Sequence, residues 1–374
     1  MQMSHFDLNQ YSEDSKKEGF CMLHTGGTEQ KWTKVCRHPT GIFTNLPESK
    51  YRQSVHIGFL AYPNPKLKNQ IPASRFYCFR HAVVHNHGEK LSLKPFNPEY
   101  GTSGKLEQSI SKAEYVKKIR KVKGLLADGE IYQINYAIRF RKKFSGNPYH
   151  LFLRLIESNP TNFSAFLNCG DFQILSNSPE RLFRVEKNVI LTQPIKGTIA
   201  KSKNSKPETQ KKALEKLLAS EKERAELDMI TDLERNDVGK ICKYGTLRLT
   251  KERGVMELPN LYHTYSEVRG DLPRGTTRSE IINAMFPGGS VTGCPKKRAM
   301  EYIEKFEGMP RNIFTGSIIH IADGVMDSNI CIRTALVRKG YIEYWAGGGI
   351  VADSDPEAEY AECLLKAEKF LGIL

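Results

Sequence analysis

The sequence predicts an α+β fold built on large antiparallel sheets. Apolar strands come in closely spaced pairs, such as residues 163–167 with 172–176 and residues 181–186 with 189–193. Helical stretches separate these pairs instead of following every strand. Strands joined by a short turn pair antiparallel, whereas a doubly wound parallel sheet needs a crossover helix between neighbouring strands. The order of the elements therefore favours antiparallel sheets.

The first strongly periodic elements begin after residue 110. Ser111 and Glu114 have the spacing of a capping box, and apolar residues then recur every three or four positions, which predicts a helix. The next segment, IYQINYAIRF at residues 131–140, alternates strictly, with Tyr132 on its apolar face, and predicts a strand. Residues 1–104 hold clusters of glycine, proline and asparagine between short apolar runs, so we expect irregular strands and loops there.

The remaining elements follow from the same periodicities. Helices are expected over residues 149–157, 207–235, 279–285 and 295–306, and strands over residues 246–250, 264–272, 313–321, 330–337 and 341–347. Asp355 followed by Pro356 has the pattern of a helix N-cap and first turn, so a last helix is expected to start there.

The composition excludes several classes of protein. The chain has 374 residues, of which 39% are hydrophobic and 26% are charged, as in a globular protein and unlike a disordered chain. No apolar run reaches 18 residues, and the N-terminus lacks the apolar segment of a secretory signal. None of the eight cysteines has CxxC or zinc-type spacing, so reduced thiols are expected. These features predict a cytoplasmic protein with no membrane partner.

The chain is strongly basic, with a formal net charge of +14. Such a charge is compatible with nucleic acid or with small anionic substrates. The excess is spread along the sequence, and no nucleic-acid-binding motif accompanies it. A basic surface around a pocket for an acidic substrate explains the charge as well, so we expect no nucleic-acid partner. A basic nucleic-acid-binding protein stays the non-enzyme alternative.

A predicted hairpin brings Glu180 and Lys196 together. The strands at 181–186 and 189–193 flank a turn, and residues at equal distances from a turn lie opposite each other in an antiparallel pair. Glu180 and Lys196 are then neighbours at the open end of the hairpin. A carboxyl group and an amine held together can serve as acid and nucleophile. From spacing alone, an ordinary cross-strand ion pair is favoured.

Two pairs of glutamates have i, i+3 spacing within predicted helices. Glu223 and Glu226 lie in ERAELDM, and Glu359 and Glu362 lie in EYAECLLKA, where Lys366 shares the face of Glu362. If the two faces met, their carboxylates would form an oxygen site suited to Mg²⁺. Each pair alone is more often part of a solvated helix face.

Three further segments each have two interpretations. FPGGSVTGCPKKRAM at residues 286–300 is either an anion site at a helix start or a tight turn. The glycine triplet of WAGGGIVADSDPEAEY at residues 345–360 either leaves backbone amides open to a ligand or marks a bend. The polar stretch within residues 227–240 is either a buried support network or a helix end.

In this order, these segments resemble the chorismate-utilising enzyme family. The family includes component I of anthranilate synthase, component I of aminodeoxychorismate synthase, isochorismate synthase and salicylate synthase. The resemblance rests on IYQIN, SPERLF, PIKGT, ELDMITDLERNDVG, HTYSEVRG, FPGGSVTGCPKKRAM, FTGSIIHI, IRTALV and AGGGIVADSDPEAEYAECLLKA, between residues 111 and 374. It implies a large sandwich of two antiparallel sheets with helices outside. Residues 105–374 would form the chorismate-binding catalytic domain, with residues 1–104 as a short region packed on this core.

The resemblance also implies roles for individual residues. Glu180 matches the general acid that protonates the leaving hydroxyl group. Mg²⁺ would be bound by Glu226 and Glu362, with Glu223 and Glu359 in support, and would clamp the ring carboxylate of chorismate. The positions matching substrate contacts are Arg333, Lys366, Thr198, His263 and the backbone of Gly347 and Gly349.

Two positions imply the branch of the family. Members that use water as nucleophile carry a lysine base where this chain has Gln133, which argues against isochorismate and salicylate synthases. Anthranilate synthases resemble PIAGT where this chain has PIKGT. Lys196 therefore implies aminodeoxychorismate synthase component I, with anthranilate synthase component I as the alternative. In that branch the lysine resembles a nucleophile that attacks ring carbon 2 before ammonia enters at carbon 4.

The resemblance implies a partner subunit as well. The sequence has no glutaminase motif, so ammonia would come from a glutamine amidotransferase subunit. The product would be 4-amino-4-deoxychorismate, on the path to p-aminobenzoate and folate. Two residues depart from the family pattern: Cys294 replaces a usual alanine, and Phe314 replaces a frequent tyrosine near the substrate.

Overall fold

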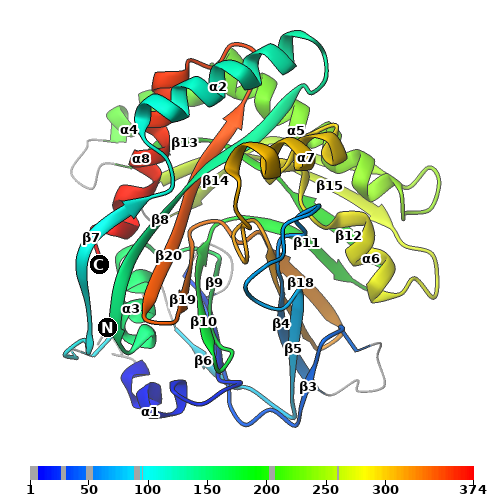
Figure 1. Cartoon of the computed structure of the whole chain (residues 1–374). Helices are drawn as coiled ribbons and strands as arrows, with labels where there is room; N and C mark the ends of the chain where they lie inside the picture. Colours follow the sequence, from blue (N-terminus) through cyan, green and yellow to red (C-terminus); the bar gives the residue numbers. More distant parts are fainter. Residues whose placement is uncertain are drawn as a thin grey trace.

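Two antiparallel sheets form the framework of the protein. The computed structural model describes residues 7–26, 31–47, 54–87, 93–94, 96–201, 207–258 and 261–374, and each sheet has ten strands within these ranges. Figure 1 shows the sheets with helices gathered around them. The predicted fold class, a two-sheet antiparallel sandwich with helices, is confirmed.

The strand order mixes early and late parts of the chain. The first sheet has the order β16 (Gly293–Cys294), β8 (Gln133–Gly146), β20 (Tyr341–Ile350), β19 (Thr334–Arg338), β10 (Phe172–Ser178), β9 (Phe163–Asn168), β1 (Cys21–Thr25), β2 (Trp32–Cys36) and β6 (Val83–Asn86), with β7 (Tyr100–Gln108) also on β8. The second sheet has the order β13 (Ile195–Ala200), β15 (Leu261–Asp271), β12 (Val189–Gln193), β11 (Arg181–Glu186), β18 (Val325–Asn329), β17 (Ser317–Ala322), β4 (Val55–Leu60), β5 (Ser74–Phe79) and β3 (Gly41–Phe43), with β14 (Arg248–Leu258) also on β15.

Helices cover the sheets. They are η1 (Leu8–Tyr11), α1 (Ser12–Ser15), α2 (Lys112–Ala127), α3 (Pro148–Ser158), α4 (Pro207–Leu218), α5 (Glu221–Gly239), α6 (Arg278–Met285), η2 (Gly289–Val291), α7 (Lys296–Glu307) and α8 (Pro356–Leu371). α2 packs on α8, which packs on β20, while α5 packs on β15 and α7 on β8 (Figure 1). Within the described part of the chain, no helix combines the length and apolarity needed to cross a bilayer.

The core has three main parts. One apolar cluster fills the space between the sheets and includes Phe59 of β4 and Ile174 of β10. A second joins α2 and α8 to the first sheet, and a third joins α5 and α6 to the second sheet. Since each sheet is covered on both faces, its central strands carry nearly continuous buried residues. This layering explains why β10 and β19 lack strict polar alternation.

The described residues before 105 belong to both sheets. β1 pairs with β9, and β4 pairs with β17, so early strands extend sheets whose other members come much later. β7 runs across residue 104 and pairs with β8. The division into a region 1–104 and a domain 105–374 stays a prediction.

Several element boundaries differ from the sequence-based expectation. The single helix expected over residues 207–235 is wrong: α4 and α5 are separate, because Ser220 accepts a hydrogen bond from the Glu223 amide and caps a new helix. β18 was not expected, since its sequence VMDSN is largely polar. Two predicted strands begin later than expected, at β17 and β19. Tyr132 lies outside β8 and is 63% exposed, so its expected place on the apolar face is wrong.

A fully buried ion pair lies between β8 and the η2 turn. The Arg311 and Glu307 side chains are 0% and 1% exposed, with Nη2 and Oε1 2.6 Å apart. Arg311 also donates to the carbonyls of Asn135 and Val291, at 2.8 and 3.0 Å. Glu307 accepts from the Ala137 amide at 3.0 Å. The pair therefore holds β8 and the η2 turn in one fixed arrangement.

We expect Arg311→Met to destabilise the protein strongly. Removing one partner leaves the other charge buried and unpaired, which costs about 3–5 kcal/mol. The measurement is the urea unfolding midpoint. Arg298→Met is the matched control, because it breaks an Arg–Glu pair whose side chains are 45% and 42% exposed and costs about 0–1 kcal/mol. Similar losses in both variants would contradict a special role for the buried pair.

Candidate active site

Glu180 carries a buried carboxyl group and lies immediately before β11. It is 6% exposed, and its Oε1 accepts a hydrogen bond from Ser290 Oγ at 3.0 Å. Its backbone is fixed by bonds to Ser178 and Ile330. Burial raises the pKa of Glu180 to about 7, although the Ser290 bond and the charge of Lys196 lower it. A carboxyl group with this pKa can hold and deliver a proton near neutral pH.

Lys196 projects from β13 next to a bulge. It pairs with Thr264 of β15, and the register then shifts at Gly197, whose φ of 68° lies in the left-handed region. Lys196 Nζ lies 3.4 Å from Glu226 Oε2. A Cβ atom on Gly349 would lie 3.6 Å from Lys196 Nζ and 3.1 Å from the amide nitrogen of Gln133. The lysine and the amide therefore converge on the glycine-rich end of β20.

The predicted hairpin forms, but with a shifted register. β11 and β12 pair around the turn at Lys187–Asn188, and a bulge lies between Arg181 and Arg184. β12 ends at Gln193, and after Pro194 the chain pairs with β15 instead. Lys196 is thus not in the β11–β12 ladder itself. It still acts on Glu180, since its charge lowers the pKa of that carboxyl group.

The end of β20 offers an open backbone edge. Among the described strands, β19 pairs with β20 only up to Tyr344, so the glycine triplet pairs with β8 alone. Opposite Gly349, the Asn135 amide donates away from β20, to Thr292; opposite Gly347, the Ala137 amide donates to Glu307. These are non-hydrogen-bonded pairs, so the N–H groups of both glycines point to the open edge.

His263 lies beside Thr198 on the β13–β15 pair. Its Nδ1 is 2.8 Å from Thr198 Oγ1 and 3.2 Å from the carbonyl oxygen of Gly197. A carbonyl oxygen only accepts, so this contact assigns the proton to Nδ1. Burial and then the charge of Arg333 lower the pKa of His263 to about 4. The ring is therefore neutral, and its buried Nε2 is an acceptor with no hydrogen-bond partner among the described residues.

Arg333 has an uncommon backbone conformation. Its φ of 50° is left-handed, which few residues other than glycine adopt. The Asn177 amide donates to the Arg333 carbonyl at 3.0 Å and stabilises this turn. Burial lowers the pKa of Arg333, while Tyr344 and Glu180 raise it. Because the Arg333 charge also lowers the pKa values of Glu180 and His263, the three groups share one electrostatic environment.

The four glutamates lie on two helices that flank this region. On α5, Glu226 contacts Lys196, and a Cβ atom on Gly197 would lie 3.3 Å from Glu223 Oε2. On α8, Glu362 Oε1 lies 2.6 Å from Lys366 Nζ. Glu359 is buried and accepts from Ser354 Oγ at 2.7 Å. In the described ranges, no three metal-binding side chains form one cluster.

The donor set fits a magnesium ion. Mg²⁺ takes one or two carboxylates and completes its octahedron with water and substrate oxygens, so a cluster of three is not required. Two of the carboxylates already bind a cationic group, namely the ammonium groups of Lys196 and Lys366. A Cβ atom on Gly348 would lie 3.3 Å from Glu359 Oε2 and 3.9 Å from Glu362 Oε1, so the glycine keeps this space clear.

Sequence comparison assigns the family. The sequence model of the chorismate binding enzymes matches residues 49–372. The chain belongs to the chorismate-binding enzyme family. Aminodeoxychorismate synthase component 1 of Salmonella typhimurium is 40% identical over 266 residues, which cover 71% of this chain and 58% of that protein. Anthranilate synthase component 1 of Aquifex aeolicus is 39% identical over 265 residues, which cover 70% of this chain and 53% of that protein.

The relatives bear on length and fold. The aligned part spans somewhat more than half of these curated relatives. The crystal structure of anthranilate synthase component I from Streptococcus pneumoniae matches with a TM-score of 0.75 at 25% identity, covering 95% of this chain and 90% of that one. The architecture of this chorismate-binding enzyme is thus that of anthranilate synthase component I.

Sequence reasoning missed two residues of this chorismate-binding enzyme. Ser290, the hydrogen-bond donor to Glu180, lies in the glycine-rich η2 turn. No pattern in the sequence indicates this contact, because it depends on how the turn packs against Glu180. Glu234 is 2% exposed and near Glu180, and burial followed by the charge of Asp237 raises its pKa to about 8. Glu234 belongs to the polar stretch of residues 227–240, for which the sequence predicted either a buried support network or a helix end. A buried network is correct for Glu234 and for Asp237, which binds Lys296 at 2.5 Å.

The glycine-rich segment before α7 forms a tight turn. α5 packs directly on it: a Cβ atom on Gly289 would lie 2.5 Å from Leu233 Cδ2. Gly293 has a φ of 146°, and a Cβ there would lie 2.2 Å from the Gln133 carbonyl oxygen. The glycines are therefore explained by close packing around Ser290.

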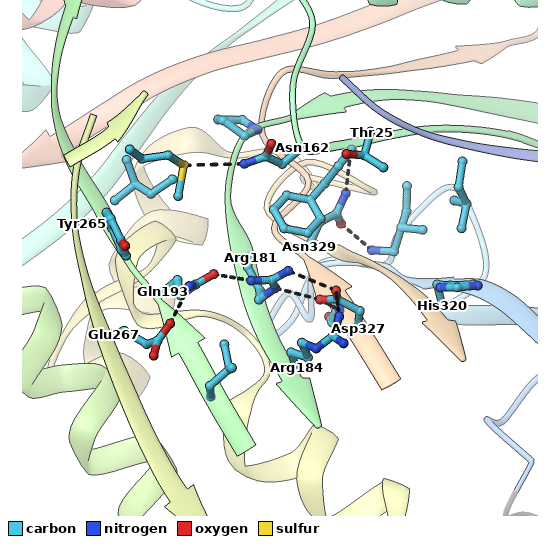
Figure 2. Close-up of a pocket in the computed structure, with 18 of the residues that line it drawn as sticks. Thr25, Asn162, Arg181, Arg184, Gln193, Tyr265, Glu267, His320, Asp327 and Asn329 are labelled. Carbon is cyan, nitrogen blue, oxygen red and sulfur yellow. Dashed lines mark hydrogen bonds and ion pairs between the residues drawn. The ribbon is translucent and has the colours of Figure 1, made fainter. Parts of the chain in front are cut away.

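A cavity of about 970 Å³ lies on the face of β11 and β13 opposite to Glu180 and Lys196. Its walls include Thr25 and Phe163 of the first sheet and Asp327 of the second. Figure 2 shows Arg181 bonded to Asp327 and Gln193, and Gln193 bonded to Glu267. Pro179, Arg181 and Ile195 line the cavity, but their neighbours Glu180 and Lys196 do not. Since successive side chains along an extended chain point to opposite faces, the cavity and the candidate active site lie on opposite sides of these strands.

We expect Glu180→Gln to stabilise the protein at neutral and alkaline pH. The folded-state pKa of about 7 lies above the ordinary value of 4.5, so the native carboxyl loses stability as the pH rises from about 4.5 to about 7. Over this window the advantage of the glutamine variant should grow by about 3 kcal/mol and then stay constant. Denaturant unfolding at a series of pH values measures it. A stability difference that does not change with pH would contradict the raised pKa.

Proposed function

We propose that this chain is component 1 of an aminodeoxychorismate synthase, which converts chorismate and ammonia to 4-amino-4-deoxychorismate. The observation that carries the proposal is Lys196, a lysine directed at the glycine-rich edge beside Gln133 and electrostatically coupled to the buried acid Glu180. The 40% identical Salmonella typhimurium protein carries this name. An amine and an acid at one centre suit a substitution in which a hydroxyl group leaves.

Glu180 would supply the proton for the leaving group. Hydroxide is a poor leaving group, so the hydroxyl on ring carbon 4 must be protonated as its C–O bond breaks. A carboxyl group with a pKa of about 7 is largely protonated below neutral pH. The Ser290 hydroxyl donates a hydrogen bond to Oε1 of Glu180 and so holds the carboxyl group in place.

Lys196 would act as a covalent nucleophile. Its ammonium group would first lose a proton to water. The neutral amine then attacks ring carbon 2, the two ring double bonds shift, and the carbon 4 oxygen leaves as water with the proton from Glu180. Ammonia then attacks carbon 4, the double bonds shift back, and the lysine nitrogen leaves carbon 2. The reaction exchanges a hydroxyl for an amino group with no change in oxidation state.

The remaining residues would bind the substrate's two carboxylates. Arg333 can form paired hydrogen bonds to one carboxylate, and Lys366 on α8 reaches the Gly347 carbonyl at the open edge of β20. The amides of Gly347 and Gly349 point to the open edge of β20. Thr198 and His263 form the wall on the β13 side.

Magnesium is part of this proposal. Glu226 and Glu362 would hold Mg²⁺, with Glu223 and Glu359 in support, and the bound ion would supply Lewis-acid stabilisation of the ring carboxylate. Ammonia would come from a glutamine amidotransferase subunit, in keeping with the component 1 in the relatives' names. The reaction would serve p-aminobenzoate and folate synthesis in the cytoplasm.

Product identification tests the proposed reaction. With chorismate, Mg²⁺ and ammonium, the protein should form non-aromatic 4-amino-4-deoxychorismate, separable by chromatography from the fluorescent aromatic anthranilate. Glutamine should replace ammonium only when an amidotransferase subunit is added. Anthranilate as the product would establish the alternative function, and glutamine use by the isolated chain would contradict the expected partner.

A trapped adduct tests the role of Lys196. Without ammonium, chorismate and Mg²⁺ should add mass to the peptide that contains Lys196, and Lys196→Ala should lose both this adduct and most amination at carbon 4. Arginine keeps the charge but stays protonated, so Lys196→Arg should be as impaired as Lys196→Ala. An active Lys196→Arg enzyme, with no adduct in the unaltered protein, would rule out covalent catalysis.

A further inference from the structure

In each glutamate pair of the predicted metal site, one glutamate forms an ion pair with a lysine. Lys366 Nζ lies 2.6 Å from Glu362 Oε1 and donates to the Gly347 carbonyl at 3.0 Å. Lys196 Nζ lies 3.4 Å from Glu226 Oε2. The two carboxylates assigned to Mg²⁺ are therefore the same two that bind ammonium groups. Both lysines are also assigned to the substrate.

The Lys366–Glu362 pair is suited to exchange. The two residues are one turn apart on α8, and their side chains are 48% and 51% exposed. Half-exposed pairs of this kind are weak, because water competes for both charges. Breaking the pair exposes no buried group, so either partner can take another ligand without disturbing the helix. The Lys196–Glu226 pair is more enclosed and joins β13 to α5, with side chains 20% and 18% exposed.

A magnesium ion and an ammonium group compete for one carboxylate. Each neutralises the same negative charge, and the two cations repel each other at contact distance. Glu359, the other carboxylate near Gly348, is buried and accepts from Ser354, so α8 offers Glu362 as its exposed ligand. Lys366 must therefore leave Glu362 before this helix can contribute fully to a metal ion.

We propose that Lys366 couples substrate binding to metal binding by exchanging one carboxylate for another. In the free protein its ammonium group is held by Glu362. A carboxylate of the anionic substrate takes over the lysine, and Glu362 is released to Mg²⁺. The coupling is reciprocal, so metal binding equally releases Lys366 for the substrate. The identity of the substrate rests on the proposed function, whereas the competition between lysine and metal does not.

Calorimetric titration with Mg²⁺ alone tests the competition. Lys366→Met removes the competing ammonium group, so the protein should bind Mg²⁺ about two- to fivefold more tightly, as expected for a half-exposed pair. Lys366→Arg keeps a cation on Glu362 and should bind Mg²⁺ as the unaltered protein does. Lys369→Met is the matched control: it removes an exposed positive charge from the same helix, and Lys369 forms no ion pair with a described residue.

Repeating the titration with saturating chorismate and no ammonium tests the coupling. Chorismate should tighten Mg²⁺ binding to the unaltered protein, both because its ring carboxylate would bind the ion and because it would release Glu362 from Lys366. Lys366→Met removes only the second contribution, so the chorismate-dependent gain in Mg²⁺ affinity should be about two- to fivefold smaller in this variant. Equal Mg²⁺ affinities in Lys366→Met and Lys369→Met would overturn the competition. A chorismate effect of the same size in Lys366→Met would overturn the coupling. A wrong proposed function would appear separately, as a different product in the amination assay.

Discussion

The buried pair of Arg311 and Glu307 is the constraint on which the site depends. A single guanidinium group binds backbone carbonyls of β8 and of the η2 turn, and its partner carboxylate binds the β8 amide of Ala137. β8 in turn fixes the open edge of β20, while the η2 turn carries the hydroxyl that orients Glu180. Because both charges are fully desolvated, neither can move without leaving the other unpaired. The same buried ion pair therefore fixes the positions of both Glu180 and the open edge of β20.

Several residues of the site destabilise the folded protein locally. Glu180 and Glu234 are both buried carboxyl groups whose pKa values are raised, to about 7 and about 8. Arg333 occupies a left-handed backbone conformation and is partly desolvated. Packing in the three apolar clusters, one between the sheets and two on their outer faces, offsets these unfavourable contributions to stability. Glu180, Arg333 and His263 thus share a buried environment that keeps their pKa values away from the ordinary values they would have in water.

Periodicity predicted the regular elements well where local signals dominate. The capping box at Ser111 and the N-cap at Asp355 occur as expected, and the hairpin around Lys187 forms with a shifted register. It failed at Ser220, where a local cap divides one expected helix into two. It also failed where tertiary contacts decide, because the polar β18 is a strand only through its pairing with β11 and β17 on its two edges. The two glutamate pairs lie on helices as expected, whereas Lys196 lies on β13, outside the predicted hairpin. Contacts such as Ser290 to Glu180 lie beyond any spacing rule, because 110 residues separate the partners.

The strand order has a consequence for synthesis of the chain. β17 and β18 lie between β4 and β11, and β19 and β20 lie between β10 and β8, so the last strands to be made occupy the middle of both sheets. Between the emergence of β4 and that of β17, translation takes on the order of 10–50 s. Throughout that time β4 lacks the neighbour that later covers its edge, and so does β11 once it has been made. Exposed edges recruit other chains. The nascent protein therefore has its greatest need of chaperone protection before residue 317, when most of its sequence already exists.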